Sequence, residues 1–379
     1  MYLYQQTNRY FAQAPDDVKD IAEAELRALG VQESDASFRG IHFAAIPEVL
    51  YKVNYQSRLI NRILAPLIKF KCPSDHILYE KASMLKWDDF LDNTKTFAIF
   101  ATVSNSQITH SKYAALRLKD AIVDYFRNRT GERPSIDTRE PDVWFNLHID
   151  YDEATISLDT SGGSLHRRGY RKESVEAPMI ETLAAAIIKH SGWNGQTPLY
   201  DPLCGSGTLL CEAYLHAANI PGGILRPKFG FERLPDFDAS LWQKVKEAAL
   251  QNIKPIPPGL IAGSDKLAAA VRAAQTNCAV LDKNKAIEIT QQDMFKIKNP
   301  GNRTIVCNPP YGIRLGKDTN LYRFYKNWSD FLKQRCRNSV VFIYFGEKKY
   351  LKSMNLKPSW KKPLAAGGLD GRLVKYELY

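Results

Sequence analysis

The sequence contains few of the residues that would indicate a metal centre or a disulfide framework. Its 379 residues include seven histidines and six cysteines. No two cysteines form a CxxC pair, and the histidines are dispersed along the chain. We therefore expect reduced cysteines and predict no metal site. The cysteines are Cys72, Cys204, Cys211, Cys278, Cys307 and Cys336.

Long apolar runs are also missing. No stretch approaches the run of about 20 apolar residues that spans a bilayer. The N-terminal stretch MYLYQQTNRYFAQAP lacks the basic-then-apolar order of a signal peptide. A hydrophobic content of 44% is sufficient for ordinary packed cores. These features predict a globular cytoplasmic protein, not bound to a membrane, with roughly two domains of about 150 residues each.

Basic residues are scarce in the first part of the chain and abundant in the second. Residues 1–160 hold 19 Lys and Arg against 23 Asp and Glu, a net charge of −4. Residues 161–379 hold 33 against 18, a net charge of +15. This asymmetry favours a polyanionic partner held near the second part, although basic proteins need not bind nucleic acid.

The texture of the sequence changes near residue 160. In 1–160, an amphipathic helix that ends at Gly30, a strand at 96–104 and a helix that stops at Gly131 predict an α+β region. From residue 161 a glycine- and arginine-rich connection leads into short apolar strands that alternate with helices. That alternation predicts βαβ units in a mostly parallel sheet, with ligands at the carboxyl ends of the strands. The last strand, GRLVKYELY, has no helix before it and is expected to pair antiparallel.

A glycine-rich turn, DPLCGSGTLLCEA, occupies residues 201–213. A strand ends at Asp201, and Gly205 and Gly207 let the backbone turn tightly near a ligand before Thr208 begins a helix. A dinucleotide site would need a third glycine at position 210, which is a leucine, and an acidic residue about 20 positions on. The nearest suitable acid, Asp265, lies 58 residues after Gly207. An ordinary NAD site is therefore disfavoured.

Two acidic residues follow the next two predicted strands. Asp265 ends GLIAGSD and can accept hydrogen bonds from two ribose hydroxyls, while Asp293 in QQDMF is placed to contact an adenine amino group. Either aspartate could instead cap a helix, which is the common role of an aspartate after a strand.

The most informative motif is Asn308–Pro309–Pro310–Tyr311, directly after the apolar run TIVC. The lone pair of an exocyclic amine on a base is conjugated into the ring, so two acceptors aimed at its N–H bonds would make it more nucleophilic. The side-chain carbonyl of Asn308 and the backbone carbonyl of Pro309 can be those acceptors. Tyr311 offers a face on which an extruded base can stack. Positioning and oriented dipoles then supply the rate without a strong general base.

These motifs, in this order, make the chain resemble the THUMP-domain class I methyltransferases that modify RNA, most closely the bacterial 23S rRNA guanine-N2 methyltransferases. The resemblance extends over SLHRRGYR (164–171), APMIETLAA (177–185), FERLPDF (231–237) and the segment from TFAIFATVS through RPSID. It implies an α/β protein: an N-terminal α+β ferredoxin-like and THUMP region over 1–160, and a C-terminal Rossmann-like seven-stranded methyltransferase domain over 161–379.

The resemblance also implies roles for particular residues. The cofactor would be S-adenosyl-L-methionine, with the methionine end at the glycine-rich turn, the ribose at Asp265 and the adenine at Asp293 and Met294. The residues expected to bind it are Asp201, Cys204, Gly205, Ser206, Gly207, Thr208, Asp265, Asp293, Met294 and Asn308. The residues expected to act on the base are Asn308, Pro309, Pro310 and Tyr311. Arg167, Arg168, Tyr170 and Arg171 would contact cofactor or RNA, or else form a structural linker.

Several alternatives stay open at the level of sequence. The partner would be RNA, either 23S rRNA or a ribosome assembly intermediate, but the Asn–Pro–Pro–Tyr motif also suits adenine N6 in DNA or RNA. Ile313 stands where related proteins usually carry an acidic residue, and a single methyltransferase domain is expected here. A third hypothesis is an RNA-binding assembly protein without catalytic activity. Neither the modified nucleotide nor the oligomeric state follows from the sequence.

Overall fold

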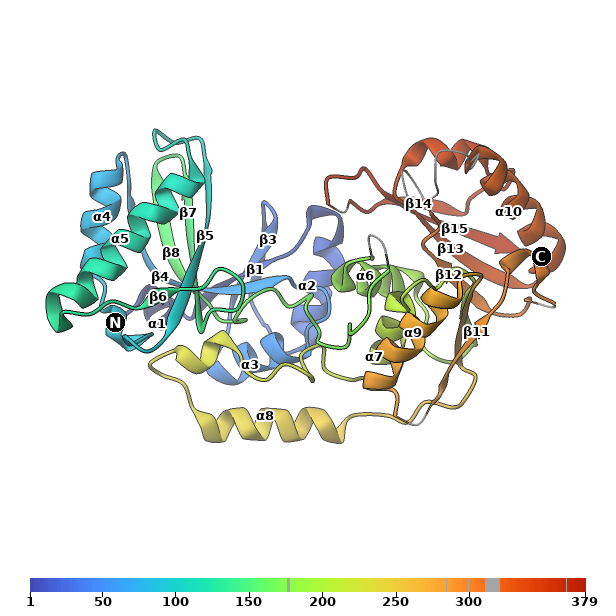
Figure 1. The fold of residues 1–379 in the computed structure, drawn as a ribbon, viewed down its shortest axis with the longest axis horizontal. Coiled ribbons are helices and arrows are strands. Elements are labelled where there is room, and N and C mark those ends of the chain that lie inside the picture. Colours follow the sequence, from blue (N-terminus) through green and yellow to red (C-terminus); the bar gives the residue numbers. More distant parts are fainter. Residues whose placement is uncertain (176–177, 284, 299, 311–320, 366) are drawn as a thin grey trace. The chain divides into compact units, whose positions relative to one another are not determined.

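A computed structural model describes residues 1–175, 178–283, 285–298, 300–310, 321–365 and 367–379, and the chain within it forms two compact units. The first unit contains Met1–Lys19, Glu23–Leu165 and Arg226–Glu247. The second contains Asp20–Ala22, His166–Leu225 and Ala248–Tyr379. Each unit is built on its own β-sheet (Figure 1). Compared with the sequence division at residues 160 and 161, the main difference is Arg226–Glu247, which groups with the first unit.

The first unit contains an eight-stranded sheet in the order β2-β3-β1-β4-β8-β7-β5-β6. Its strand bounds are β1 (Arg9–Gln13), β2 (Ser34–Ser37), β3 (Gly40–Ala44), β4 (Arg62–Lys71), β5 (Thr96–Ser104), β6 (Ser135–Ile136), β7 (Val143–Asp150) and β8 (Glu153–Asp159). Strand β4 pairs with β1 on one side and with β8 on the other, so it joins the two halves of the sheet. Its register shifts between Pro66 and Ile68, as expected where proline cannot donate a ladder hydrogen bond.

Helices cover this sheet and lead into it. The helical segments of the N-terminal part are α1 (Leu3–Thr7), η1 (Asp16–Val18), α2 (Lys19–Ala28), α3 (Pro47–Gln56), α4 (Asp75–Ser83), η2 (Trp87–Asp89) and α5 (Ser111–Thr130). Helix α5 packs on α4 and against β5. It ends where the sequence predicts, because Gly131 adopts the left-handed conformation with φ 77° and its N–H closes the last turn on Arg127.

The inserted segment Arg226–Glu247 is held to the first unit by aromatic packing. The Phe231 ring in η3 (Gly230–Arg233) lies 4.6 Å from the Tyr51 ring of α3. Trp242 of α8 (Ala239–Gln251) lies 5.2 Å from Tyr55, centroid to centroid. Arg226 donates to the backbone carbonyls of Ser161 and Gly162. Large buried rings dominate packing energies, which accounts for the grouping of this segment with residues far away in sequence.

The second unit contains a seven-stranded sheet in the order β11-β10-β9-β12-β13-β15-β14. The strand bounds are β9 (Leu199–Asp201), β10 (Ile261–Asp265), β11 (Ile287–Gln291), β12 (Thr304–Cys307), β13 (Ser339–Phe345), β14 (Trp360–Pro363) and β15 (Arg372–Leu378). The strands from β11 to β13 pair parallel, and β15 pairs antiparallel with β13. The prediction for the last strand is confirmed. With the first unit, this sheet confirms the predicted fold class.

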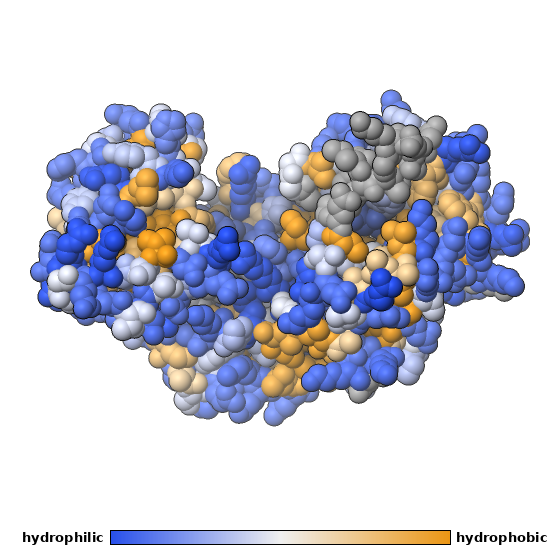
Figure 2. All heavy atoms as spheres, viewed as in Figure 1, coloured by the Kyte–Doolittle hydropathy of each residue, from blue (hydrophilic) through white to orange (hydrophobic). Residues whose placement is uncertain are grey.

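The remaining helical segments of the described chain lie along the second sheet: α6 leads into β9, and the others follow its parallel strands, as βαβ topology requires. They are α6 (Glu181–Ser191), α7 (Thr208–Ala217), α9 (Ala268–Leu281), η4 (Met294–Lys296), α10 (Leu321–Arg335) and η6 (Lys348–Ser353). Side chains of β12, β13 and β15 form a core with α10 and η6 that includes Trp328, Tyr325 and Phe345. In the described part of the chain, no helix has both the length and the apolar character needed to cross a membrane. On the face drawn in Figure 2, hydrophilic residues dominate the surface.

Candidate active site

The predicted site residues of the second unit lie at one edge of its sheet. Strands β9, β10, β11 and β12 are parallel neighbours, so their carboxyl ends meet at the same edge. Asp201 and Asp265 are the last residues of β9 and β10, and Asn308 directly follows β12. One hydrogen bond joins two of the predicted motifs, because the Gly205 N–H donates to Asp265 Oδ2 at 3.1 Å.

The glycine-rich turn depends on its two glycines for different reasons. Gly205 and Gly207 have φ angles of 53° and 81°, the left-handed region in which side chains are strained. Among the described residues, a Cβ at Gly205 would meet only Val175 Cγ2, at 3.9 Å, so these residues leave the face above Gly205 open. A Cβ at Gly207 would lie 3.2 Å from both Ala274 and Cys278. Gly205 therefore leaves room for a ligand, whereas Gly207 permits close packing of the turn on α9.

Asp201 is a buried carboxyl group with one resolved backbone partner. Its Oδ1 accepts the Leu203 N–H at 3.0 Å, and the residue is 1% exposed. Burial raises the pKa of Asp201 from 3.8 to about 8; the Leu203 hydrogen bond opposes this shift and the nearby Asp265 adds to it. The group is therefore poised to ionise when a cation comes close.

The raised pKa of Asp201 predicts a pH-dependent stability difference for Asp201→Asn. Between about pH 4 and pH 8 the unfolded chain ionises this group while the folded chain keeps its proton, so the free energy of unfolding falls as pH rises. Asparagine cannot ionise, so the free energy of unfolding of the variant relative to wild type should increase by roughly 1.4 kcal/mol per pH unit in this window. Urea unfolding over this pH range measures it, and a pH-independent difference would contradict the assignment.

Asp265 and Asp293 behave differently as caps. Asp293 Oδ1 accepts the Phe295 N–H at 3.0 Å and caps η4, so the capping alternative is confirmed for this residue. Asp265 does not cap α9; its Oδ1 accepts the Leu267 N–H at 3.0 Å, and Leu267 precedes that helix. The Met294 side chain is buried in the core, so any ligand contact there falls to its backbone.

Asn308 presents an acceptor without a partner. Its Oδ1 is buried and has no hydrogen-bond partner among the described residues. An unsatisfied buried carbonyl oxygen costs free energy, and native proteins contain few such groups. Pro309 is buried, and the Pro310 carbonyl accepts a 3.3 Å hydrogen bond from the Tyr325 hydroxyl. Tyr311 lies outside the described residues.

Two residues of the arginine-rich segment have structural roles. Arg168 and Tyr170 are 2% and 1% exposed. Arg168 Nε and the Tyr170 hydroxyl both lie close to Glu212 Oε1 of α7, at 3.4 and 2.9 Å. Their burial against Glu212 supports the structural alternative for these two side chains, and their contact with cofactor or RNA stays an untested prediction. Arg167 is exposed, and its contact remains a prediction.

Arg171 is hydrogen-bonded to the glycine-rich turn and to the segment that leads into α6. Its guanidinium donates to Glu181 Oε1 at 2.9 Å, to the Met179 carbonyl at 2.8 Å, to Ser206 Oγ at 3.3 Å and to Thr208 Oγ1 at 3.2 Å. Ser206 and Thr208 are both buried. These contacts make Arg171 a positioning residue for the turn.

Asn277 of α9 also links the arginine-rich segment to the glycine-rich turn. The sequence did not predict this role. Its Oδ1 accepts the N–H groups of Lys172 and Glu173 at 2.7 and 3.0 Å. Its Nδ2 donates to the Ser206 carbonyl at 3.0 Å. The sequence feature that could have identified Asn277 is its place as a polar residue in the helical run AAQTNCAV. Glu212 stands in the same way in the apolar run TLLCEAYL. Such a signal indicates a buried polar contact but not its partner.

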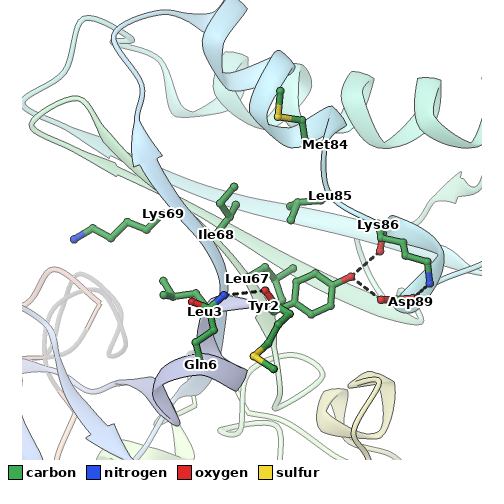
Figure 3. Close-up of a pocket in the computed structure, with 11 residues that line it drawn as sticks. Tyr2, Leu3, Gln6, Leu67, Ile68, Lys69, Met84, Leu85, Lys86 and Asp89 are labelled. Carbon is green, nitrogen blue, oxygen red and sulfur yellow. Dashed lines mark hydrogen bonds and ion pairs between the residues drawn. The ribbon is translucent and has the colours of Figure 1, made fainter.

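We also searched the described residues for a metal centre and for a second site. No cluster of metal-ligating side chains occurs among the residues that the structure describes. A pocket of about 490 Å³ lies in the first unit between α1, β4 and η2 (Figure 3). Its two lysines are paired, Lys69 with Glu153 and Lys86 with Asp89, and the pocket contains none of the predicted site residues. We assign it no role.

Comparison with protein families divides the chain into three matched regions. The RMKL-like methyltransferase domain matches residues 168–375. The THUMP domain matches residues 74–159, and the RlmL ferredoxin-like domain matches residues 9–64. The residues described above at the carboxyl edge of the second sheet therefore fall in the methyltransferase match, and the eight-stranded sheet falls largely in the other two.

Two curated relatives match nearly the whole chain. The Synechocystis protein slr0064, named as a candidate RNA methyltransferase, is 38% identical over 374 residues, which are 98% of this chain and 97% of that protein. The ribosomal RNA large subunit methyltransferase K/L of Syntrophotalea carbinolica is 37% identical over 98% of this chain. The match covers 53% of that longer protein, so the chain spans about half the length of the K/L relatives.

Solved structures agree over the full length. The structure of SMU.472, solved in complex with SAH, has a TM-score of 0.85 and 26% identity and covers 98% of both chains. A Listeria monocytogenes structure described as a predicted N6-adenine-specific DNA methylase has a TM-score of 0.83 and 26% identity, over 100% of this chain and 99% of its own. The folds of both units are thus shared with solved structures.

Proposed function

Because the chain belongs to the RMKL-like methyltransferase family, we propose that it transfers a methyl group from S-adenosyl-L-methionine to the exocyclic N2 amino group of a guanine in RNA. The RNA is proposed to be 23S rRNA or a ribosome assembly intermediate. The relatives named for large-subunit rRNA methylation, together with the THUMP match, support RNA as the substrate class.

The residues at the carboxyl edge fit S-adenosylmethionine. The open face above Gly205 leaves space for the ligand backbone, and Asp201 offers a carboxyl group to the methionine ammonium. Asp265 is half-buried, and its oxygens retain lone pairs for ribose hydroxyls beyond the two backbone N–H groups they accept. The remaining acceptor capacity of Asp293 would serve the adenine amine. SAH in the structure of SMU.472 supports this assignment. When bound at this edge of the present chain, S-adenosylmethionine would supply an electrophilic methyl group on its sulfonium.

Asn308 would activate the target amine as a nucleophile. Its buried Oδ1 would accept one N–H of the target amine, and the Pro309 carbonyl would accept the other. Both interactions pull the amine lone pair out of conjugation and aim it at the methyl carbon. Fixed dipoles of this kind stabilise the transition state because they need no reorganisation during the reaction. The proton that the amine loses afterwards passes to water.

The observation that carries the proposal is the buried Asn308 Oδ1 at the carboxyl edge, which has no hydrogen-bond partner among the described residues. The test incubates the protein with labelled S-adenosylmethionine and 23S rRNA from a strain that lacks the gene, followed by digestion to nucleosides. We expect N2-methylguanosine. Labelled product without N2-methylguanosine would refute the guanine assignment.

A second candidate is methylation of adenine N6. The likeness to the Listeria structure, described as a predicted N6-adenine-specific DNA methylase, favours it, and the Asn–Pro–Pro motif accepts either amine. The same digest distinguishes the two, because adenine methylation yields an N6-methyladenine nucleoside. Mass spectrometry of rRNA nucleosides with and without the gene identifies the product in cells.

Arg171→Lys should weaken cofactor binding while leaving the KM for RNA nearly unchanged. Lysine keeps the charge but cannot reach Glu181, Ser206 and Thr208 together, so the glycine-rich turn loses its support. We expect the KM for S-adenosylmethionine to rise about tenfold, the equivalent of one lost charged hydrogen bond. Arg272→Lys, on the exposed surface of α9, is the matched control. Equal effects of the two substitutions would contradict the positioning role.

A further inference from the structure

The last strands of the second unit bring lysines to the catalytic edge of the sheet. Strand β14 pairs antiparallel with β15, and β15 pairs antiparallel with β13, so β14 runs in the same direction as β13 and β12. The end of β14 therefore lies at the edge where Asn308 follows β12. Segment η6, which follows β13, begins at this edge as well. The five lysines of these two segments, here called the basic rim, are Lys348, Lys349, Lys352, Lys361 and Lys362.

The basic rim carries uncompensated positive charge. All five side chains belong to exposed residues. Lys348 pairs with Asp370 at 2.7 Å and Lys349 with Glu347 at 2.5 Å. Lys352, Lys361 and Lys362 have no carboxylate partner in the part of the chain that the structure describes.

Around Lys362 the surroundings are basic and aromatic. Its Nζ lies 3.4 Å from His190 Nδ1 of α6 and 5.3 Å from the centroid of the Trp360 ring. No acid neutralises it within the described residues, and the adjacent ring provides a face next to the charge. A cation beside an aromatic face is a common arrangement at surfaces that bind single-stranded nucleic acid.

The position of the rim matches a substrate that extends beyond its reacting base. Strand β14 is three places from β12 in the sheet, which corresponds to about 14 Å at the usual strand spacing. A few nucleotides of RNA cover that distance. Phosphates next to a base held at Asn308 would therefore reach the lysines of η6 and β14.

We propose that the basic rim binds phosphates of the RNA that flank the target nucleotide. This inference rests on the proposed function and adds the surface that holds the substrate on the catalytic unit. Lysines on an edge strand can also serve to discourage pairing with another sheet. That role would not account for Lys352, which lies in η6 and not on the strand.

The test is the triple variant Lys352→Gln/Lys361→Gln/Lys362→Gln in the full chain. The probes are a short single-stranded RNA of mixed sequence and 23S rRNA from the strain that lacks the gene. A plot of the logarithm of the RNA association constant against the logarithm of salt concentration has a negative slope. Loss of three phosphate contacts should reduce the magnitude of that slope by about 2 and weaken binding at low salt by about tenfold or more. The affinity for SAH should not change.

A matched control replaces three lysines at the opposite edge, Lys254→Gln/Lys283→Gln/Lys333→Gln. These residues precede the amino ends of β10, β11 and β13, and the control should bind RNA like the wild type. An unchanged salt slope in the rim variant would overturn the proposal. An equal loss of RNA affinity in the control would overturn it as well.

The two readouts separate this inference from the proposed function. Normal formation of N2-methylguanosine by the rim variant, with unchanged RNA binding, would overturn the rim and leave the function standing. If the rim variant loses salt-dependent RNA binding and the wild-type protein yields labelled product without N2-methylguanosine, the rim is supported and the guanine assignment is refuted.

Discussion

Asn308→Ala should lower kcat by about 10²–10³ at saturating cofactor, the loss typical of removing one preorganised polar group. The buried Oδ1 has no partner in the described protein, so it can accept a hydrogen bond from the proposed substrate amine. Alanine removes the acceptor and leaves the amine lone pair in conjugation with the base. Single-turnover methylation of 23S rRNA measures the effect on the chemical step.

Two further variants sharpen this result. Asn308→Asp keeps an oxygen acceptor and should retain more activity than Asn308→Ala. Gln334→Ala, which removes an exposed amide from α10, should leave kcat unchanged. If Asn308→Ala had a normal kcat, the role assigned to this side chain would be wrong. RNA association that persists in a wild-type protein without turnover would instead support the inactive assembly protein.

Glu212→Ala should lower the free energy of unfolding by about 3–5 kcal/mol, as expected when one partner of a buried ion pair is removed. Glu212 is fully buried, and Arg168 Nε and the Tyr170 hydroxyl both contact its Oε1. Burial raises the pKa of Glu212, while Arg168 and Tyr170 favour its ionised form. Alanine would remove the carboxylate that contacts the Arg168 guanidinium in the core and the acceptor of the Tyr170 hydroxyl. Urea unfolding of the full chain measures the loss.

The control for Glu212→Ala is an exposed pair in the same unit. Lys349→Ala breaks the 2.5 Å contact with Glu347, and we expect little change in the free energy of unfolding because solvent screens exposed charges. The double variant Arg168→Met/Glu212→Leu should recover much of the stability, since apolar residues of similar volume often replace a buried pair without loss. Similar small effects for Glu212→Ala and Lys349→Ala would contradict the structural role of the cluster.

The sequence was sufficient where local pattern and chain order carry the information. Apolar strands that alternate with helices require a parallel sheet, and strands of one direction place their ends at one edge. The positions of Asp201, Asp265 and Asn308 at that edge followed from this rule, and the structure confirms it. The ligand contacts assigned to these residues remain proposals.

Strands and helices whose formation depends on distant partners were not predicted. Strand β4 contains Pro66, which weakens a strand pattern, yet pairing with β1 and β8 on either side holds it in the sheet. Strand β14 has only four residues, and β15 is its one strand partner within the described chain. Helix α8 lies in the segment that the sequence placed in the second domain. In each case the stabilising contacts come from residues far away in the chain.

Side-chain partners were decided by the tertiary structure alone. The arginine-rich segment could have contacted RNA or formed a linker, and only the burial of Arg168 and Tyr170 against Glu212 separates these roles. The glycine-rich motif predicted a tight turn that could lie next to a ligand. The hydrogen bonds of that turn to Arg171 and Asn277 form only because α7 and α9 pack together. Periodicity fixes which face of an element is apolar, whereas the partner of a buried polar group depends on how the elements meet in space.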